Sequence, residues 1–160
     1  MYWKNINALK KVLIQGELPQ KMQFWYVLVT FLIYEVFLEI ASYIPSDDTS
    51  YLDYLSSIIT VLMAILSVVF SYKANGSDNG KYFMQRYISI NFVVSFRYGI
   101  LIFFPIFILL IIGSAIVSMI YNIELFDKVI IFIFIAVLDF VVMYYTIKHV
   151  KDVAENFIEK

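Results

Sequence analysis

Four long apolar runs are the feature that most constrains how this chain can fold. They span residues 24–44, 51–71, 98–121 and 128–147. The hydrocarbon core of a bilayer is about 30 Å thick, and about 20 apolar residues in a helix cross it. Soluble domains are about 45–50% apolar, whereas this chain is 62% hydrophobic. The runs therefore predict an all-α integral membrane protein with four transmembrane helices.

Short connections and the placement of basic residues predict the topology. The connections "PSDDTS" and "YNIELFDK" make each pair of runs an antiparallel hairpin, giving a four-helix bundle in a single membrane domain over 1–160. Eleven of the twelve Lys and Arg residues lie before the first run, in or beside the 73–97 loop, or in the 148–160 tail. Basic residues stay on the cytoplasmic side. We therefore expect both termini in the cytoplasm and the chain in the inner (plasma) membrane, surrounded by the lipid bilayer.

Missing residue types exclude several classes of function. The chain has no cysteine and one histidine, which excludes disulfide scaffolds, Cys-ligated zinc or iron–sulfur sites and haem held by paired histidines. It carries no H-E-x-x-H or G-x-S-x-G motif and no phosphate-cradling glycine loop. A basic patch interleaved with aromatics away from lipid is also missing. We therefore expect neither an enzyme nor a nucleic-acid-binding protein, and no cofactor or metal.

The segment 1–21 is predicted to hold an amphipathic interfacial helix. The apolar residues of 2–15 share one helical face, and Gly16 and Pro19 end the helix. Such a helix lies in the plane of the membrane interface or docks a protein partner. Lys10 and Lys11 are its predicted membrane or partner contacts.

The segment 73–97 is predicted to be a cytoplasmic loop followed by a second interfacial helix. Arg86 and Arg97 are expected to face lipid phosphates, because an Arg stem lies easily along apolar surface while its guanidinium stays polar. Pro105 is expected to kink the third span.

The cytoplasmic tail 148–160 continues the last span as a helix with an apolar stripe. Val150, Val153 and Phe157 recur at helical spacing within it. A stripe of this kind needs a covering surface. The N-terminal helix, another subunit and a separate cytosolic protein remain alternatives.

Acidic residues inside the apolar runs are the main candidates for function. Glu35 and Glu39 lie four residues apart in the first run, and Asp139 lies in the fourth. A carboxylate at the centre of a membrane helix costs roughly 2.5–3.5 kcal/mol on insertion scales. These acids must therefore face protein or water, or stay protonated.

A polar stripe on the second run could face those acids. Asp53, Ser56, Thr60 and Ser67 belong to it, within an arc of about 100°. Small residues at this spacing suit close helix packing as well as a water-filled lining. The acids themselves could be neutral carboxyls hydrogen-bonded within the bundle, could bind or pass a cation or proton, or could contact a partner's basic residue.

Three function hypotheses remain open from the sequence. The first is a homo-oligomeric channel, pore-like protein or membrane-sensing effector that works with a cytosolic partner, for example in a phage-defence or toxin-type operon, by analogy of build alone. It rests on an acidic outer mouth that comprises Glu39, Asp47, Asp48, Asp53, Glu124 and Asp127. The second is a proton- or cation-coupled small transporter. The third is a structural membrane anchor for a soluble protein.

The transporter hypothesis has a limited resemblance behind it. Glu35 among Phe and Tyr residues resembles small four-span multidrug exporters, which place a glutamate in the first span. The long amphipathic N-terminus and tail depart from that pattern. The one-sided distribution of basic residues also opposes the dual topology that lets such exporters form antiparallel dimers.

Overall fold

The computed structural model describes residues 2–16, 18–42, 51–121 and 124–157, with side chains except at 35–42, 111, 114–116, 118–121 and 124–128. Every element in this part of the chain is helical, which confirms the predicted all-helical class. In chain order the elements are α1 (Ile6–Ile14), α2 (Gln20–Ser42), α3 (Tyr51–Ala74), the 3₁₀ helix η1 (Ser77–Asn79), α4 (Phe83–Ser95), the π-helix η2 (Phe96–Phe103), α5 (Phe104–Tyr121) and α6 (Glu124–Glu155).

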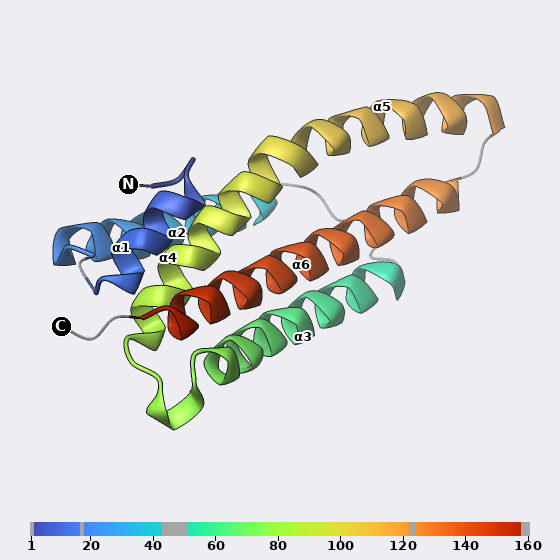
Figure 1. Ribbon diagram of the computed structural model, residues 1–160. Helices are drawn as coiled ribbons and strands as arrows, with labels where there is room; N and C mark the ends of the chain where they lie inside the picture. Colours follow the sequence, from blue (N-terminus) through green and yellow to red (C-terminus); the bar gives the residue numbers. More distant parts are fainter. Residues whose placement is uncertain (1, 17, 43–50, 122–123, 158–160) are drawn as a thin grey trace.

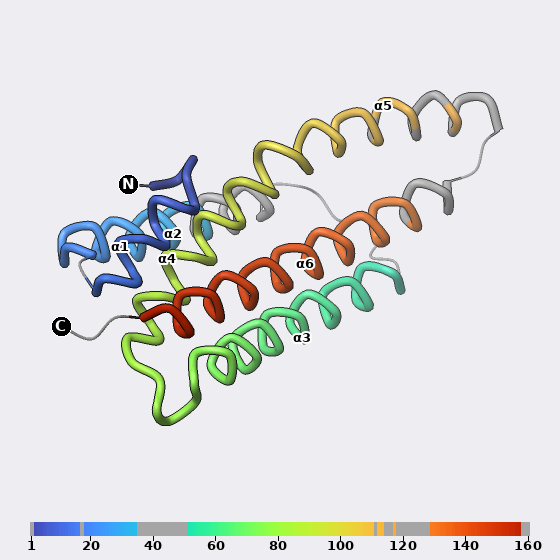
Figure 2. The backbone as a smooth tube through the Cα atoms, viewed as in Figure 1, coloured from blue at the N-terminus to red at the C-terminus, as the bar shows by residue number. Residues whose placement is uncertain are grey.

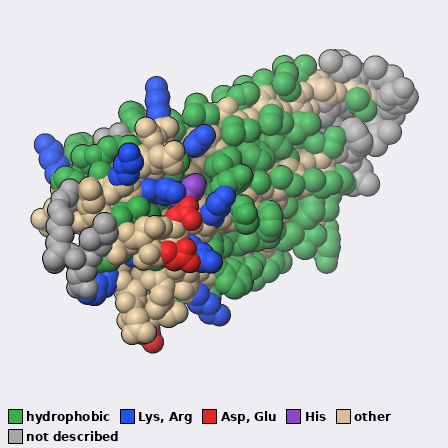
Figure 3. All heavy atoms as spheres, in the orientation of Figure 1, with side chains coloured by type: hydrophobic (Ala, Val, Ile, Leu, Met, Phe, Trp, Pro, Cys, Tyr) green, Lys and Arg blue, Asp and Glu red, His purple; other side chains and the backbone are tan. Residues whose placement is uncertain are grey.

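Three helices in the described residues are long and apolar enough to cross a membrane. They are Tyr51–Ala74, Phe83–Leu110 and Val129–Glu155, with mean hydropathies of 2.2, 2.2 and 2.5. Many of their large apolar side chains are exposed in the single chain. Figure 3 shows hydrophobic side chains over the body of the molecule, and charged side chains gathered at the end that holds α1 and the C-terminus. This division suits a protein whose body lies in lipid.

The central helix is α6. α3 lies beside it along much of its length, while α4, η2 and α5 pack against it as well, and α1 contacts it near the C-terminus (Figure 1). Within the described residues α2 packs on α4 and makes no contact with α3. The first predicted hairpin, formed by 24–44 and 51–71, is therefore not a packed pair in this part of the structure.

One continuous helical rod runs from Phe83 to Tyr121 through α4, η2 and α5. The predicted boundary between an interfacial segment at 73–97 and a span at 98–121 falls inside this rod. Figure 2 shows the rod changing direction through η2. At the end of η2 the N–H of Phe104 donates to the carbonyl of Gly99. Phe104 is followed directly by Pro105. A π-helical turn and a proline are both recognised causes of helix bending.

The buried core lies at the charged end of the molecule. It comprises Ile6, Leu9, Leu13, Leu18, Tyr26, Ile90, Phe92, Val93, Val94, Val150 and Val153. A nine-residue helix such as α1 is too short to be stable alone, so packing must hold it. Each fully buried Leu or Ile contributes about 1.5–3 kcal/mol toward this. The side chain of Asn5 caps α1 by accepting the N–H of Ala8 at 3.0 Å.

Candidate functional site

A carboxylate and a hydroxyl meet between two of the apolar helices. Thr60 lies on α3 and Asp139 on α6, and Thr60 Oγ1 donates a 2.7 Å hydrogen bond to Asp139 Oδ2. Thr60 belongs to the polar stripe of an otherwise apolar helix. At this level the stripe is turned toward α6, against which α3 packs. The contact joins the polar stripe of the second run to the acid of the fourth run, which the stripe was expected to face.

These two residues line a cavity of about 290 Å³ between α3, the α4–η2 rod and α6. Its polar lining consists of Thr60, Ser67, Tyr87, Asn91, Ser95 and Asp139. The rest of the wall is apolar or small, including Met63, Gly99 and Met143. A volume of this size holds several waters or a small ligand.

Polar groups continue from this cavity toward the charged end of the molecule. Tyr87 Oη lies 3.5 Å from Ser67 Oγ, and Thr146 Oγ1 donates to Asn91 Oδ1 at 3.3 Å. Ser71 Oγ is fully buried without a hydrogen-bond partner among the described residues. At 1.5 Å per residue, the stripe from Thr60 to Ser71 extends over about 16 Å of α3. The cavity therefore continues into a row of polar groups that runs along α3 toward the charged end of the molecule.

The electrostatics of the cavity are those of an unpaired acid. None of the described ion pairs involves Asp139, and no Lys, Arg or His lines the cavity. An ionised carboxylate in an apolar surrounding is unfavourable unless a cation or several donors stabilise it. Thr60 supplies one such donor. The site can therefore hold a cation with favourable charge complementarity.

The other predicted pathway residues are placed apart from this cavity. Asp53 and Ser56 line a separate cavity of about 80 Å³ with Ile131 and Phe132. The side chains of Glu35 and Glu39 lie outside the described residues, as do those of Asp47, Asp48, Glu124 and Asp127 in the predicted acidic mouth. The structure thus brings together Thr60, Ser67 and Asp139, and does not join Asp53 and Ser56 to them.

Sequence reasoning missed the wall that the rod contributes. Tyr87, Asn91, Ser95 and Gly99 recur every four residues and so share one face of the rod. That spacing is visible in the sequence. It was obscured because 73–97 was predicted as an interfacial segment, where a polar face points to headgroups.

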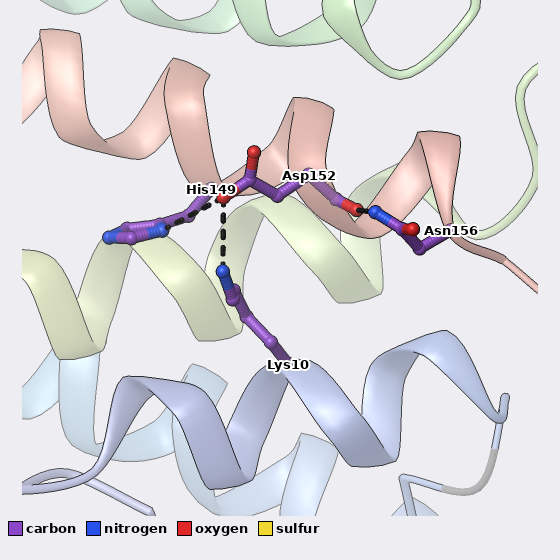
Figure 4. Close-up of polar contacts among 4 residues, drawn as sticks. All are labelled: Lys10, His149, Asp152 and Asn156. Carbon is purple, nitrogen blue, oxygen red and sulfur yellow. Dashed lines mark hydrogen bonds and ion pairs between the residues drawn. The ribbon is translucent and has the colours of Figure 1, made fainter.

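A charged cluster links α1 to the end of α6. Lys10 Nζ lies 3.0 Å from Asp152 Oδ2, and His149 Nδ1 lies 3.7 Å from the same oxygen (Figure 4). Asn156 Nδ2 donates to the Asp152 carbonyl at 2.8 Å. Lys11, in contrast, is exposed. Of the two predicted contact lysines, Lys10 therefore engages the chain's own tail.

The apolar stripe of the tail is covered within the chain. Val150 and Val153 are 0% exposed and pack in the core with Ile6, Leu9 and Leu13 of α1. Of the three covering surfaces left open by the sequence, the N-terminal helix is the one present here.

The predicted position of Arg86 is wrong. Its side chain is buried, with the residue 2% exposed, and Nη1 donates to Asn75 Oδ1 at 2.8 Å. Its guanidinium carbon lies 4.6 Å from the centre of the Phe157 ring. The tail and the 75–82 loop close over this arginine, and the cation–π contact replaces a lipid phosphate. Arg97 is exposed.

No family model matches the chain, and neither a curated protein nor a solved structure matches it significantly.

Proposed function

We propose that this chain is a four-span inner-membrane protein that binds a proton or a monovalent cation at Asp139 and passes it across the bilayer as a homo-oligomer. The observation that carries the proposal is the Asp139–Thr60 pair in a cavity between apolar helices, without a basic residue in its lining. Intramembrane acids of this kind line ion and proton pathways in membrane proteins.

The topology in this proposal follows the distribution of basic residues. Both termini and the 73–97 segment are cytoplasmic, because eleven of the twelve Lys and Arg residues lie in or beside them. In support, Figure 3 places the visible charged side chains at the end that holds α1 and the C-terminus. α2, which carries Glu35 and Glu39, is the first span in chain order and brings the number of spans to four.

The homo-oligomer is proposed because a single chain leaves its acid partly uncovered. Thr60 is exposed and Asp139 is only partly buried. In a bilayer that opening would face hydrocarbon, at a cost of several kcal/mol for an ionised group. A second copy across the opening between α3 and the rod removes that cost and encloses the pathway.

One of the surfaces on which an anchor could dock a soluble protein is covered within the chain. Val150 and Val153 were its docking stripe, and α1 already buries both. A cytosolic partner would have to use other surfaces, such as the exposed side of the 75–82 loop. The pathway proposal uses Thr60, Ser67 and Asp139, which line a cavity.

The test is ion flux into liposomes that contain the purified full-length protein. Wild type is expected to pass protons, or potassium or sodium ions, under an imposed gradient. Asp139→Asn is expected to lower the flux at least tenfold, because the amide keeps the hydrogen bond geometry but loses the charge.

The matched control is Glu155→Gln, which removes an exposed acid from the same helix. It is expected to leave flux unchanged. If Asp139→Asn and wild type conduct equally while both assemble normally on size-exclusion chromatography, Asp139 is a neutral packing residue and the proposal is overturned.

A further inference from the structure

Arg86 has a guanidinium edge that the described part of the chain leaves without a hydrogen-bond partner. The residue is 2% exposed, and its Nε and Nη2 are both buried and unpartnered there. These two nitrogens lie on the same edge of the planar group. That edge is the fork with which arginine binds a phosphate or a carboxylate through two parallel hydrogen bonds. The third nitrogen, Nη1, is already used, because it donates to Asn75 Oδ1 at 2.8 Å.

The 75–82 loop fixes the orientation of this fork. Asn75 is itself buried, and its Nδ2 donates to the carbonyl of Lys81 at 3.3 Å. Gly80 passes so close to the carbonyl of Asn75 that a Cβ at Gly80 would overlap it. The acceptor of Arg86 Nη1 is therefore held from two sides, and the fork turns away only if that bond breaks. A donor pair that is already oriented loses little freedom when an anion binds.

The charge of this guanidinium lacks a counter-charge among the described residues. None of the ion pairs there includes Arg86. Charged side chains are rarely buried unless they are paired, because apolar surroundings solvate a charge poorly. The Phe157 ring lies 4.6 Å from the guanidinium carbon. It contacts the cation through its π electrons and offers no oxygen to Nε and Nη2. The site therefore favours an anion with two oxygens.

The backbone at the start of α4 favours the same kind of ligand. Arg86 is the fourth residue of α4, and side chains on a helix lean toward its N-terminus. Tyr82, the N-cap residue, makes no side-chain hydrogen bond to the first turn of this described helix. The first N–H groups of a helix lack intrahelical acceptors and bind phosphate or carboxylate groups. The buried fork and the helix N-terminus are thus separate observations that agree.

Phe157 covers the fork from a position beyond the end of α6. The helix ends at Glu155, and the N–H of Phe157 reaches the carbonyl of Ala154 only at 3.5 Å. The ring of Phe157 lies 5.8 Å from the Tyr82 ring, between centroids, and a Cβ at Gly16 would lie 3.5 Å from it. Ring contacts therefore hold this residue in place, so it can move while α6 stays intact.

We propose that the Nε–Nη2 edge of Arg86 binds the phosphate group of a small free anion, and that Phe157 moves aside to admit it. The hydrogen bonds from a guanidinium to a phosphate are charge-assisted and bidentate, which makes them strong enough to replace the ring contact. The site is separate from the cavity that contains Asp139, because Arg86 and Phe157 do not line that cavity.

Other anions fit this site less well. The fork takes both oxygens of a carboxylate, whereas a phosphate keeps a further oxygen for the N–H groups at the start of α4. A lipid headgroup carries the same phosphate chemistry. However, the 75–82 loop and the tail enclose Arg86, and a free anion requires a smaller opening than a phosphate attached to two acyl chains.

The experiment is calorimetric titration of the full-length protein in mild detergent with sodium phosphate, in a buffer free of other oxyanions. Wild type is expected to bind at millimolar concentration. Phe157→Ala is expected to bind at least tenfold more tightly, because apparent affinity falls with the fraction of molecules whose site is closed. Phe70→Ala is the matched control. Its ring on α3 also lies near a cation, Lys73 Nζ, at 6.0 Å, and its loss should leave phosphate binding unchanged.

A second pair of variants tests the fork itself. Arg86→Lys keeps the positive charge but loses the fork. Added to Phe157→Ala, it should weaken phosphate binding at least tenfold. Arg97→Lys in the same background is the matched control, because Arg97 is exposed, and it should have no effect. If Arg86→Lys fails to fold by circular dichroism, the comparison of Phe157→Ala with wild type still tests the proposal.

Several results would overturn the inference. They are absence of phosphate binding in both wild type and Phe157→Ala, equal affinity of these two proteins, and equal loss in the two lysine variants. Acetate should bind at least tenfold more weakly than phosphate, and equal binding overturns the phosphate class. Dihexanoylphosphatidylglycerol, a water-soluble lipid, should also bind more weakly. Tighter binding of this lipid that depends on Arg86 overturns the free anion and assigns the site to headgroups.

Discussion

Thr60 Oγ1 and Asp139 Oδ2 are 2.7 Å apart and form a hydrogen bond between helices whose contacting residues are 79 positions apart in the chain. The bond links α3 to α6 at the level of the cavity. Both residues line the same cavity, and Asp139 is only partly buried there.

Thr60→Val is expected to destabilise the α3–α6 pair by about 1 kcal/mol, because interhelical hydrogen bonds in membrane proteins contribute about 0.6–1.7 kcal/mol. For a chain of this size that corresponds to a fall of about 2–4 °C in Tm. Thermal unfolding followed by circular dichroism in detergent measures it. Thr60→Ser keeps the hydroxyl and should retain most of the stability. A Thr60→Val protein as stable as wild type would show that the bond contributes nothing.

The Lys10–Asp152 ion pair predicts a charge-reversal result. Its side chains are 21% and 38% exposed, so we expect a coupling of only about 0.5–1 kcal/mol. Lys10→Glu should loosen α1 from α6, and Lys10→Glu combined with Asp152→Lys should restore it. Protease cleavage between α1 and α2 reports the loosening. The exposed pair Lys151–Glu155 on α6 is the control, and swapping it should have no effect. Failure of the double variant to recover would contradict the pairing.

Gly80 is predicted to be intolerant of any side chain. A Cβ at this position would overlap the carbonyl oxygen of Asn75, whose side chain in turn accepts from Arg86. Because backbone must move, Gly80→Ala should cost about 1–3 kcal/mol, the range of overpacked sites. Gly113→Ala has open space and should be neutral or stabilising by about 0.5–1 kcal/mol through helix propensity. Denaturant titration of both variants in detergent gives the comparison, and equal stabilities would refute the close contact.

The chain contains no cysteine, so single cysteines can report access to water. Ser95 lines the cavity that contains Asp139. A cysteine in its place should react with a membrane-impermeant thiol reagent in proteoliposomes, because thiolate forms only where water reaches. Leu109→Cys should stay unreactive. Leu109 is 70% exposed in the single chain, and only lipid would protect it. Rapid labelling at Leu109 would contradict the membrane placement of the rod.

The apolar runs predicted the helices well because length and hydropathy are local properties. The run at 51–71 became α3 and the run at 128–147 became the middle of α6, with α3 extending three residues further and α6 extending at both ends. The end of α1 was also predictable, since Gly16 adopts a φ of +68°, which favours glycine.

Pairings between distant segments were harder to predict. Arg86 was expected at the surface because an arginine near a membrane edge usually anchors there. Phe157, 71 residues later, covers it instead. Likewise, the stripe of the tail and the apolar face of α1 were both visible, but nothing in either pattern stated that each is the other's partner. The Asn91–Ser95 wall was missed for the same reason, because its role depends on what α3 and α6 place opposite.

The 32-residue length of α6 has a mechanical consequence. At 1.5 Å per residue it is about 48 Å long, which exceeds the thickness of a hydrocarbon core of about 30 Å by about 18 Å. Asp139 and Asp152 are joined along this unbroken helix by about 20 Å. A rigid tilt of about 5° around Asp139 therefore carries Asp152 sideways by about 2 Å. Because Lys10 contacts Asp152, a tilt of α6 of this kind would also shift α1.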